Sequence, residues 1–122
     1  MDQKTRDFVT EQTKALMAAP SCCAEAKAAA QAWLAAAGTA QEAAETKKYL
    51  AELAEDIMPI DGLIAFAESK AGIGYFGAAP AKQLAAHARE IKAAGAKYCD
   101  CPACTAVGAI LAKKDAMLGV IP

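Results

Sequence analysis

Apolar positions recur three or four residues apart along this chain, the spacing of a helix face, between residues that end helices. Residues 2–19 form a first amphipathic segment that stops before Pro20, because proline disfavours helical geometry at its predecessor. A second helix follows with Ser21 as its predicted N-cap and Gly38 at its end, since glycine readily takes the left-handed conformation that closes a helix.

A capping box predicts the start of the third helix. Thr39 and Glu42 stand three residues apart, so the hydroxyl and the carboxylate are each expected to accept a bond from a free amide. The apolar stripe that follows is made by Tyr49, Leu50, Leu53 and Ile57. The acidic residues fall mostly off that stripe, and we expect them to form a solvated face: Glu42, Glu45, Glu52 and Glu55.

The break at Met58 and Pro59 introduces the most apolar helix, residues 60–67, which we expect at the centre of the fold. Residues 71–77 then contain the spacing G-x-G-x-x-G. A dinucleotide-binding loop of that pattern follows a strand, whereas here a helix precedes it. We therefore interpret the segment as a flexible turn, held to the fold by Tyr75 and Phe76.

Two prolines and one glycine define the remaining helices. Pro80 occupies the first turn of a fifth helix that ends at Gly95, and Pro102 starts a sixth. Short connections and abundant alanine allow helix axes to approach closely. The sequence therefore predicts an all-α fold: a compact single-domain bundle of about six helices over residues 1–122.

Composition and charge narrow the functions that we expect. The chain has 122 residues, is 56% hydrophobic, and carries 13 basic and 14 acidic residues for a net charge of -1. No basic block is present that could neutralise several phosphates, so we expect no nucleic-acid partner. The first residues are polar and no apolar run approaches the roughly 18 residues of a membrane span, so we expect a cytoplasmic protein without a membrane partner.

The five cysteines supply the candidate chemistry. A reducing cytoplasm and an odd count argue against a framework of disulfides. Cys99, Cys101 and Cys104 form a C-x-C-x-x-C motif, in which Pro102 at the first helical position makes Cys101 the N-cap. The positive end of the helix is expected to lower the pKa of these thiols. Three thiolates are a soft ligand set, so we predict a bound metal: Zn²⁺ is the first choice, and Cu⁺ or an iron-sulfur centre stays open.

A fourth ligand has three candidates elsewhere in the chain. Cys22 and Cys23 also stand at a helix start, where a lowered thiol pKa is again expected, and Cys22 shares the inward line of Trp33. We therefore favour Cys22, whose alternative role is that of a small buried apolar residue. His87, the single histidine, is expected to face inward about 12 Å from the motif, as a core or interface residue.

Two other functions remain open. Cys101 and Cys104 form a C-P-x-C pair at a helix start, where thiol-disulfide oxidoreductases place an exposed nucleophile and a resolving cysteine. Those enzymes place the pair after a strand, and the sequence predicts no strand. The third function is a metal-free interaction module, in which alanine-rich helical faces bind a second copy or another protein.

Three segments together resemble a small all-helical, cysteine-motif family of anaerobic bacteria: residues 19–23 (APSCC), 56–61 (DIMPID) and 98–104 (YCDCPAC). The resemblance covers nearly the whole chain, and family members are often labelled as heat-shock proteins of the ninety-kilodalton chaperone type. The ATP-binding domain of that chaperone is a mixed sheet-helix unit larger than this chain. The resemblance therefore implies the helical fold and the cysteine motif, and no activity.

The segment from Asp2 to Glu42 is also similar to helical peroxidase-reductase proteins of the carboxymuconolactone decarboxylase-like superfamily, which carry CxxC on a helix. Their second cysteine would fall on Ala26 and their histidine near Ala30. Neither residue type is present at those positions, so the similarity does not imply their activity.

Overall fold

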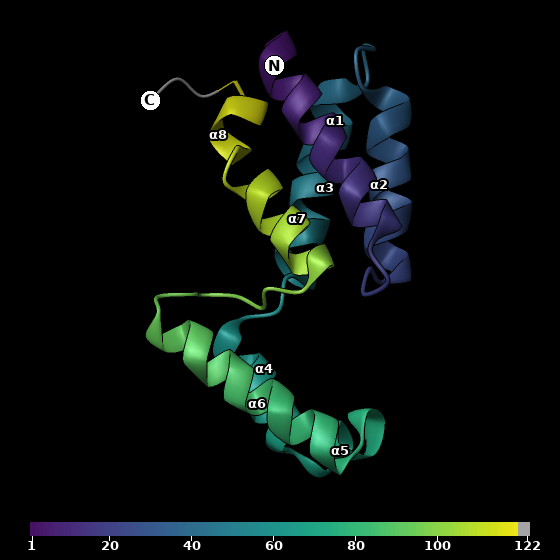
Figure 1. The fold of residues 1–122 in the computed structure, drawn as a ribbon. Helices are drawn as coiled ribbons and strands as arrows, with labels where there is room; N and C mark the ends of the chain where they lie inside the picture. The colour runs from purple at the N-terminus through teal and green to yellow at the C-terminus, as the bar shows by residue number, and fades with distance from the viewer. Residues whose placement is uncertain (120–122) are drawn as a thin grey trace. The chain divides into compact units, whose positions relative to one another are not determined.

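The computed structural model describes residues 1–119, which form eight helices (Figure 1). Their bounds are α1 Gln3–Ala18, α2 Ala24–Ala36, α3 Glu42–Asp56, α4 Ile60–Glu68, α5 Lys70–Phe76, α6 Ala78–Ala93, α7 Pro102–Leu111 and α8 Lys114–Met117. The described residues contain no strand, only an isolated antiparallel bridge between Pro59 and Tyr98. The all-α prediction is confirmed, and the two helices that the sequence did not predict are the short α5 and α8.

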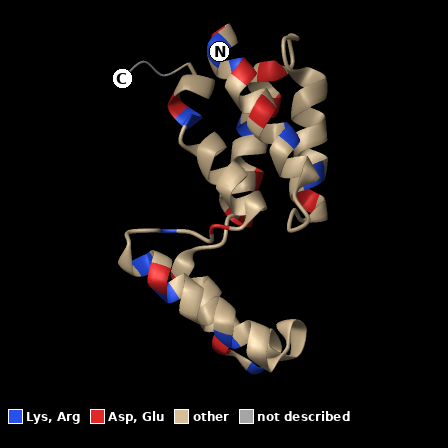
Figure 2. Ribbon diagram, in the orientation of Figure 1, with Lys and Arg blue, Asp and Glu red and all other residues tan. Residues whose placement is uncertain are grey.

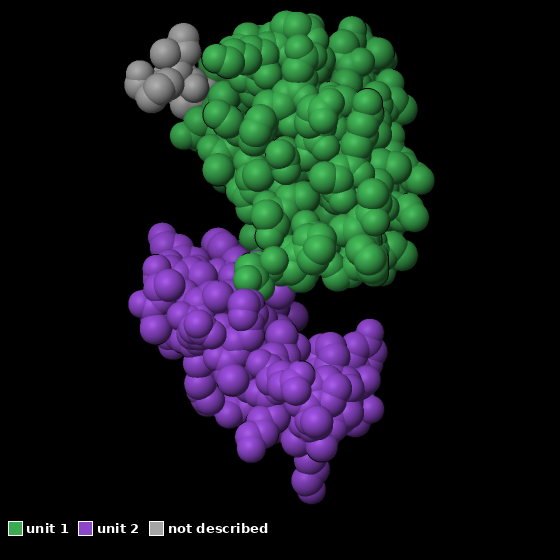
Figure 3. Space-filling view, viewed as in Figure 1, with its two compact units in different colours: residues 1–57, 100–122 green, residues 58–99 purple. Residues whose placement is uncertain are grey.

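The helices group into two compact units (Figure 3). Unit 1 comprises residues 1–57 together with the chain from Asp100 onward, and unit 2 comprises residues 58–99. The single domain over residues 1–122 stays a prediction.

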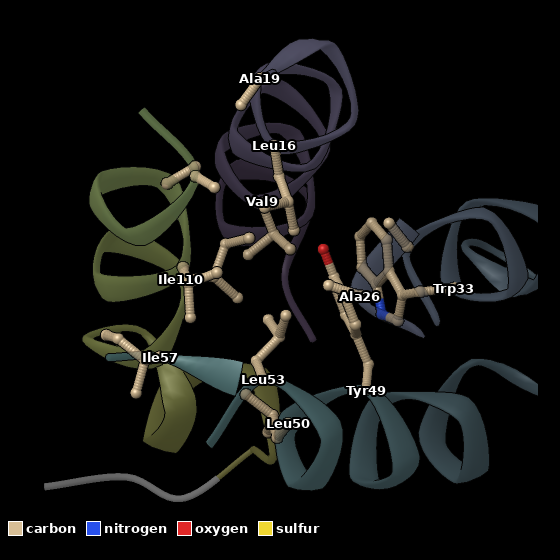
Figure 4. Packing of buried hydrophobic residues seen from close by; sticks show 14 of the residues in the cluster. Val9, Leu16, Ala19, Ala26, Trp33, Tyr49, Leu50, Leu53, Ile57 and Ile110 are labelled. Atoms are coloured by element: carbon tan, nitrogen blue, oxygen red, sulfur yellow. The ribbon is translucent and has the colours of Figure 1, made fainter. Parts of the chain in front are cut away.

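Unit 1 is built on four helices. α1 packs against α2 and α7, and α3 packs against the same two helices, so the four enclose one apolar core. Figure 4 shows side chains from all four helices meeting there, with Trp33 and Tyr49 on one side and Ile110 on the other. The largest fully buried side chains of the chain belong to this core: Trp33, Tyr49, Leu16, Leu53, Ile110, Val9, Thr13 and Thr46.

Two hydroxyl groups satisfy the polar atoms of the aromatic pair inside this core. Trp33 Nε1 donates to Thr46 Oγ1 at 3.0 Å, and the hydroxyls of Thr13 and Tyr49 share a hydrogen bond of 2.9 Å. The Trp33 and Tyr49 rings are stacked with centroids 5.8 Å apart. A buried polar group without a partner is costly, so each threonine allows a large ring to be buried.

Burial raises the pKa of Tyr49 from 10.0 to about 12, against the opposing effect of the Thr13 hydrogen bond. The folded protein therefore favours the neutral phenol, and this stabilisation is complete below pH 10. We expect it to be lost as the pH rises from 10 towards 12, at a cost of about 3 kcal/mol for a shift of this size. Urea unfolding at a series of pH values measures the loss, and Tyr49→Phe, which has no phenol to ionise, is the control. An equal alkaline loss in both proteins would contradict the assignment.

Glu42 is the exception to the predicted solvated face. It is 8% exposed, and its carboxylate accepts hydrogen bonds from Arg6 Nε at 2.6 Å and Nη2 at 3.1 Å. The Arg6 hydrogen bond holds the pKa of Glu42 below its usual value. The capping box is only partly formed, because Glu42 accepts from the amide of Gly38 rather than from that of Thr39, and Gln41 is the N-cap. The prediction that Glu42 belongs to a solvated face was wrong because Arg6, 36 residues away in the sequence, forms an ion pair with it.

Charged residues of both signs are distributed over both units (Figure 2). Two exposed ion pairs in unit 2 join α4 to α6: Arg89 to Glu68 and Lys92 to Asp61, both at 2.6 Å. Exposed pairs of this kind contribute little to stability. Among residues 1–119, no helix combines the length and the apolar character that crossing a membrane requires.

Unit 2 is a three-helix arrangement in which α4 packs against α5 and α6. Its apolar cluster is small: Ile60, Leu63 and Ala88 are buried, with four partly buried neighbours that include Cys99. The prediction that residues 60–67 lie at the centre of the fold was wrong, because the larger core belongs to unit 1 and Phe66 is 37% exposed. α4 buries only Ile60, Leu63 and Ala67, so it contributes little apolar surface despite its apolar composition.

The glycine-rich segment is a helix and not the predicted turn. α5 is capped by Ser69, whose hydroxyl accepts from the amide of Gly72 at 3.0 Å. Gly72 is required because a Cβ there would overlap the carbonyl oxygen of Phe66. Gly77 ends α5 with a φ of 92°, which side-chain-bearing residues rarely adopt. The spacing of these glycines therefore reflects close packing and a helix end.

Candidate metal centre

Cys101 begins α7 as the sequence predicted. It is the N-cap, with Pro102 at the first helical position, and its Sγ accepts a hydrogen bond from the amide of Cys104 at 3.4 Å. An extended cap residue followed by proline places the thiol over the free amides of the first turn. Cys101 and Cys104 are both half-buried against the core of unit 1.

Backbone hydrogen bonds within unit 2 hold Cys99 in place. Its amide donates to the carbonyl of Met58 at 2.9 Å, and the amide of Ile60 donates to the carbonyl of Lys97 at 2.9 Å, on either side of the Pro59–Tyr98 bridge. Its side chain is half-buried against Ile60 and its neighbours. A segment without helix or strand of its own is thus fixed by two backbone hydrogen bonds.

The sulfurs of Cys99, Cys101 and Cys104 lie within 4.8 Å of one another, and all three side chains are half-buried. Within residues 1–119 they are the one group of three cysteine, histidine or acidic residues that could hold a metal ion. In a tetrahedral zinc site with Zn–S bonds of about 2.3 Å, sulfurs are about 3.8 Å apart. The three residues belong to one hexapeptide, so side-chain rotations that move each sulfur by about an ångström would bring the sulfurs to the separation found around zinc.

Ser21 contacts this centre although its sequence position predicted another role. Its hydroxyl donates to Cys101 Sγ at 3.3 Å and accepts from the amide of Ala103 at 3.4 Å. Its predicted role as the N-cap of the second helix was wrong: Cys23 is that N-cap, and its Sγ accepts from the amide of Ala26 at 3.4 Å. Sequence spacing gives no signal for a contact between residues 80 positions apart.

A small pocket in unit 1 joins the two cysteine-bearing helix starts. It has a volume of about 70 Å³, and the polar groups of five residues line it together with apolar residues of α1, α2 and α7. The five are Ser21, Cys22, Cys23, Asp56 and Cys104. Cys22 therefore lies beside the same pocket as Cys104, but it is not a member of the group within 4.8 Å.

The thiols of Cys22 and Cys23 do not have the lowered pKa that a helix start predicts. Burial is the main cause that raises the pKa of both, and the negative charge of Asp56 raises both further. Burial removes water from the thiolate, and this outweighs the opposing effect of the Ala26 amide on Cys23 and of Lys27 on Cys22. The expectation of a lowered pKa was therefore wrong for these two residues.

Asp56 is a residue of the pocket that the sequence did not single out. Its Oδ2 is buried and, within residues 1–119, accepts no hydrogen bond. A hydrogen bond with Asp56 is also the main cause that raises the pKa of Glu52. A buried carboxylate oxygen without a donor is costly, and a cation or a water molecule in the pocket would satisfy it.

His87 lies on the exposed face of α6, so the prediction that it faces inward was wrong. The buried residues of this helix are alanines: Ala81, Ala85 and Ala88. Small side chains let α6 approach its neighbours, and this close approach selects the alanine face over the face of His87. Ala26 and Ala30, where the peroxidase-reductase motif would place its second cysteine and its histidine, are buried core residues at 2% and 0% exposure.

Comparisons with protein-family models, with curated proteins and with solved structures found no match to this chain. The family resemblances based on sequence motifs therefore stay predictions. The functional argument depends on the geometry of the cysteines and on the pocket beside them.

Proposed function

We propose that this protein binds one metal ion through the thiolates of Cys99, Cys101 and Cys104, and that the ion has a structural or regulatory role. The observation that carries the proposal is the group of three sulfurs within 4.8 Å of one another. Thiolates are soft ligands and favour Zn²⁺, Cu⁺ and iron-sulfur centres over Mg²⁺ or Ca²⁺. Zn²⁺ is our first choice, because structural zinc sites are typically built from three or four cysteine thiolates in tetrahedral geometry.

We propose Cys22 as the fourth ligand. The pocket that it shares with Cys104 supports this choice, because it places Cys22 beside one of the three proposed ligands. Asp56 is the competing candidate for the fourth metal ligand, since it lines the same pocket and its Oδ2 is buried. Four protein ligands leave no position for a catalytic water, and this is why we propose a structural or regulatory ion.

The size of the pocket also argues against an organic substrate at the cysteines. Pockets for small organic ligands usually measure at least about 300 Å³, whereas this one measures about 70 Å³. A pocket this small accommodates an ion and a few water molecules. The larger hollows of unit 2, between α4 and α6 and beside α5, are lined by none of the cysteines.

A thiol-disulfide oxidoreductase is the second candidate. It is favoured by the placement of Cys101 at the N-cap of α7 and of Cys104 one turn later, which is the arrangement of a redox dithiol. In that function Cys101 is the nucleophile and Cys104 resolves the mixed disulfide. The third candidate is a metal-free interaction module in which the cysteines only pack against the core.

The cellular setting follows from the same proposal. Cysteines stay reduced in the cytoplasm, where we place the protein without a nucleic-acid or membrane partner. A homodimer or another protein partner would bind at exposed alanine-rich helical faces. Size-exclusion chromatography with light scattering measures the oligomeric state.

Metal analysis of anaerobically purified protein tests the proposal. We expect about one ion per chain, and we expect Cys104→Ser to lose it, because serine is a poor ligand for soft metals. A metal-free wild type with a reversible Cys101–Cys104 disulfide at a cytosolic potential would instead favour the oxidoreductase. A wild type with neither property would leave the packing module.

A further inference from the structure

Ser21 is presented to the cysteine motif by a tight turn. The amide of Cys22 donates to the carbonyl of Ala19 at 3.1 Å, which makes residues 19–22 a β-turn with Pro20 at its second position. Proline is favoured there because its φ is already fixed. The turn therefore holds the Ser21 side chain in one place against the start of α7.

The two hydrogen bonds of Ser21 determine the direction in which its hydroxyl points. Its oxygen accepts from the amide of Ala103, and its single proton is donated to Cys101 Sγ. The same sulfur accepts a second bond from the amide of Cys104. A sulfur that accepts two hydrogen bonds suits a thiolate that is also bound to a metal, because a thiolate has three lone pairs and no proton to donate.

We propose that Ser21 is a positioning residue of the metal centre, whose hydroxyl orients the Cys101 sulfur and stabilises its negative charge. The proposal rests on the proposed metal site. Groups that hydrogen-bond to a metal ligand fix its orientation, and their loss typically weakens metal binding by about 10- to 100-fold. The turn between α1 and α2 thus contributes to a site whose ligands lie about 80 positions later in the chain.

Ser21→Thr and Ser21→Val are the matched variants, because their side chains have nearly the same shape and differ in one hydroxyl. Each protein is purified anaerobically, stripped of metal and titrated with Co²⁺, and Zn²⁺ affinity follows from competition. We expect the threonine variant to resemble the wild type. We expect the valine variant to bind both ions about 10- to 100-fold more weakly, with a shifted sulfur-to-Co²⁺ charge-transfer band.

Ser69→Ala is the control for the loss of a serine cap, since Ser69 accepts from an amide at the start of α5 and lies 30 positions before the first cysteine of the motif. We expect its metal affinity and its absorption band to equal those of the wild type. Equal affinities and bands for the threonine and valine variants would overturn the role of Ser21 while leaving the metal site intact. A wild type that binds neither Co²⁺ nor Zn²⁺ would overturn the proposed function itself, and the role of Ser21 with it.

Discussion

Cys101→Ser loses metal binding whereas Cys23→Ser retains it: this is the largest difference that we expect between two variants of this protein. Both residues are N-caps whose sulfur accepts from the amide three positions later at 3.4 Å. Serine is a good N-cap, so both variants keep their helix starts. They differ because only Cys101 belongs to the group of three sulfurs.

The expected loss of affinity follows from the part of the metal-binding free energy that one ligand contributes. Structural zinc sites contribute about 10 to 16 kcal/mol of binding free energy, or about 2.5 to 4 kcal/mol for each of four ligands. We therefore expect Cys101→Ser to weaken Zn²⁺ binding by about 60- to 700-fold. Competition with a chromophoric chelator under anaerobic conditions measures both variants. A Cys101→Ser protein that still holds one ion as tightly as the wild type would rule out this centre.

Trp33→Ala is expected to produce the largest loss of stability in unit 1. Trp33 is 0% exposed, stacks on Tyr49, and donates to Thr46. Its removal leaves a cavity and a buried hydroxyl without its donor, so we expect the free energy of unfolding to fall by about 4 kcal/mol. Urea unfolding followed by far-UV circular dichroism measures it, because the chain has one tryptophan and the variant lacks its fluorescence.

Two further variants separate the causes. Trp33→Phe keeps an aromatic ring but no N–H donor, and we expect a loss of about 1 to 3 kcal/mol. Gln31→Ala changes an exposed residue of the same helix and should stay within about 0.5 kcal/mol of the wild type. Chelator in all samples removes any contribution from a bound ion. If Trp33→Ala unfolded at the same urea concentration as Gln31→Ala, Trp33 would not belong to the four-helix core of unit 1.

Local rules predicted the helices of this chain well. Pro20, Gly38 and Gly95 end helices where the sequence indicates, because the fixed φ of proline and the positive φ of glycine act on the backbone alone. The N-cap role of Cys101 could be predicted for the same reason, since Pro102 beside it sets the helix start. The group of three thiols follows from this local geometry and from the closeness of Cys99 in sequence.

Predictions failed where a contact between distant residues competed with a local rule. Ser21 accepts a hydrogen bond from Ala103 in the first turn of α7, 82 positions later, and Arg6 pairs with Glu42 across 36 positions. Gly72, predicted to lie in a turn, belongs to α5, which packs on α4 and α6 with the backbone of Phe66 against this glycine. Each failure has the same origin: a polar or small residue can satisfy several partners, and sequence spacing does not choose among them.

The amino-acid sequence by itself determined the helical class, most helix ends and the C-x-C-x-x-C motif, because propensity, proline and glycine geometry and short spacing act within one turn of chain. The tertiary structure decided that Ser21 meets Cys101, that Cys22, Asp56 and Cys104 share one pocket, and that His87 stays exposed. These outcomes depend on which helix faces pack together, and packing is selected by the buried area and polar partners of the whole unit.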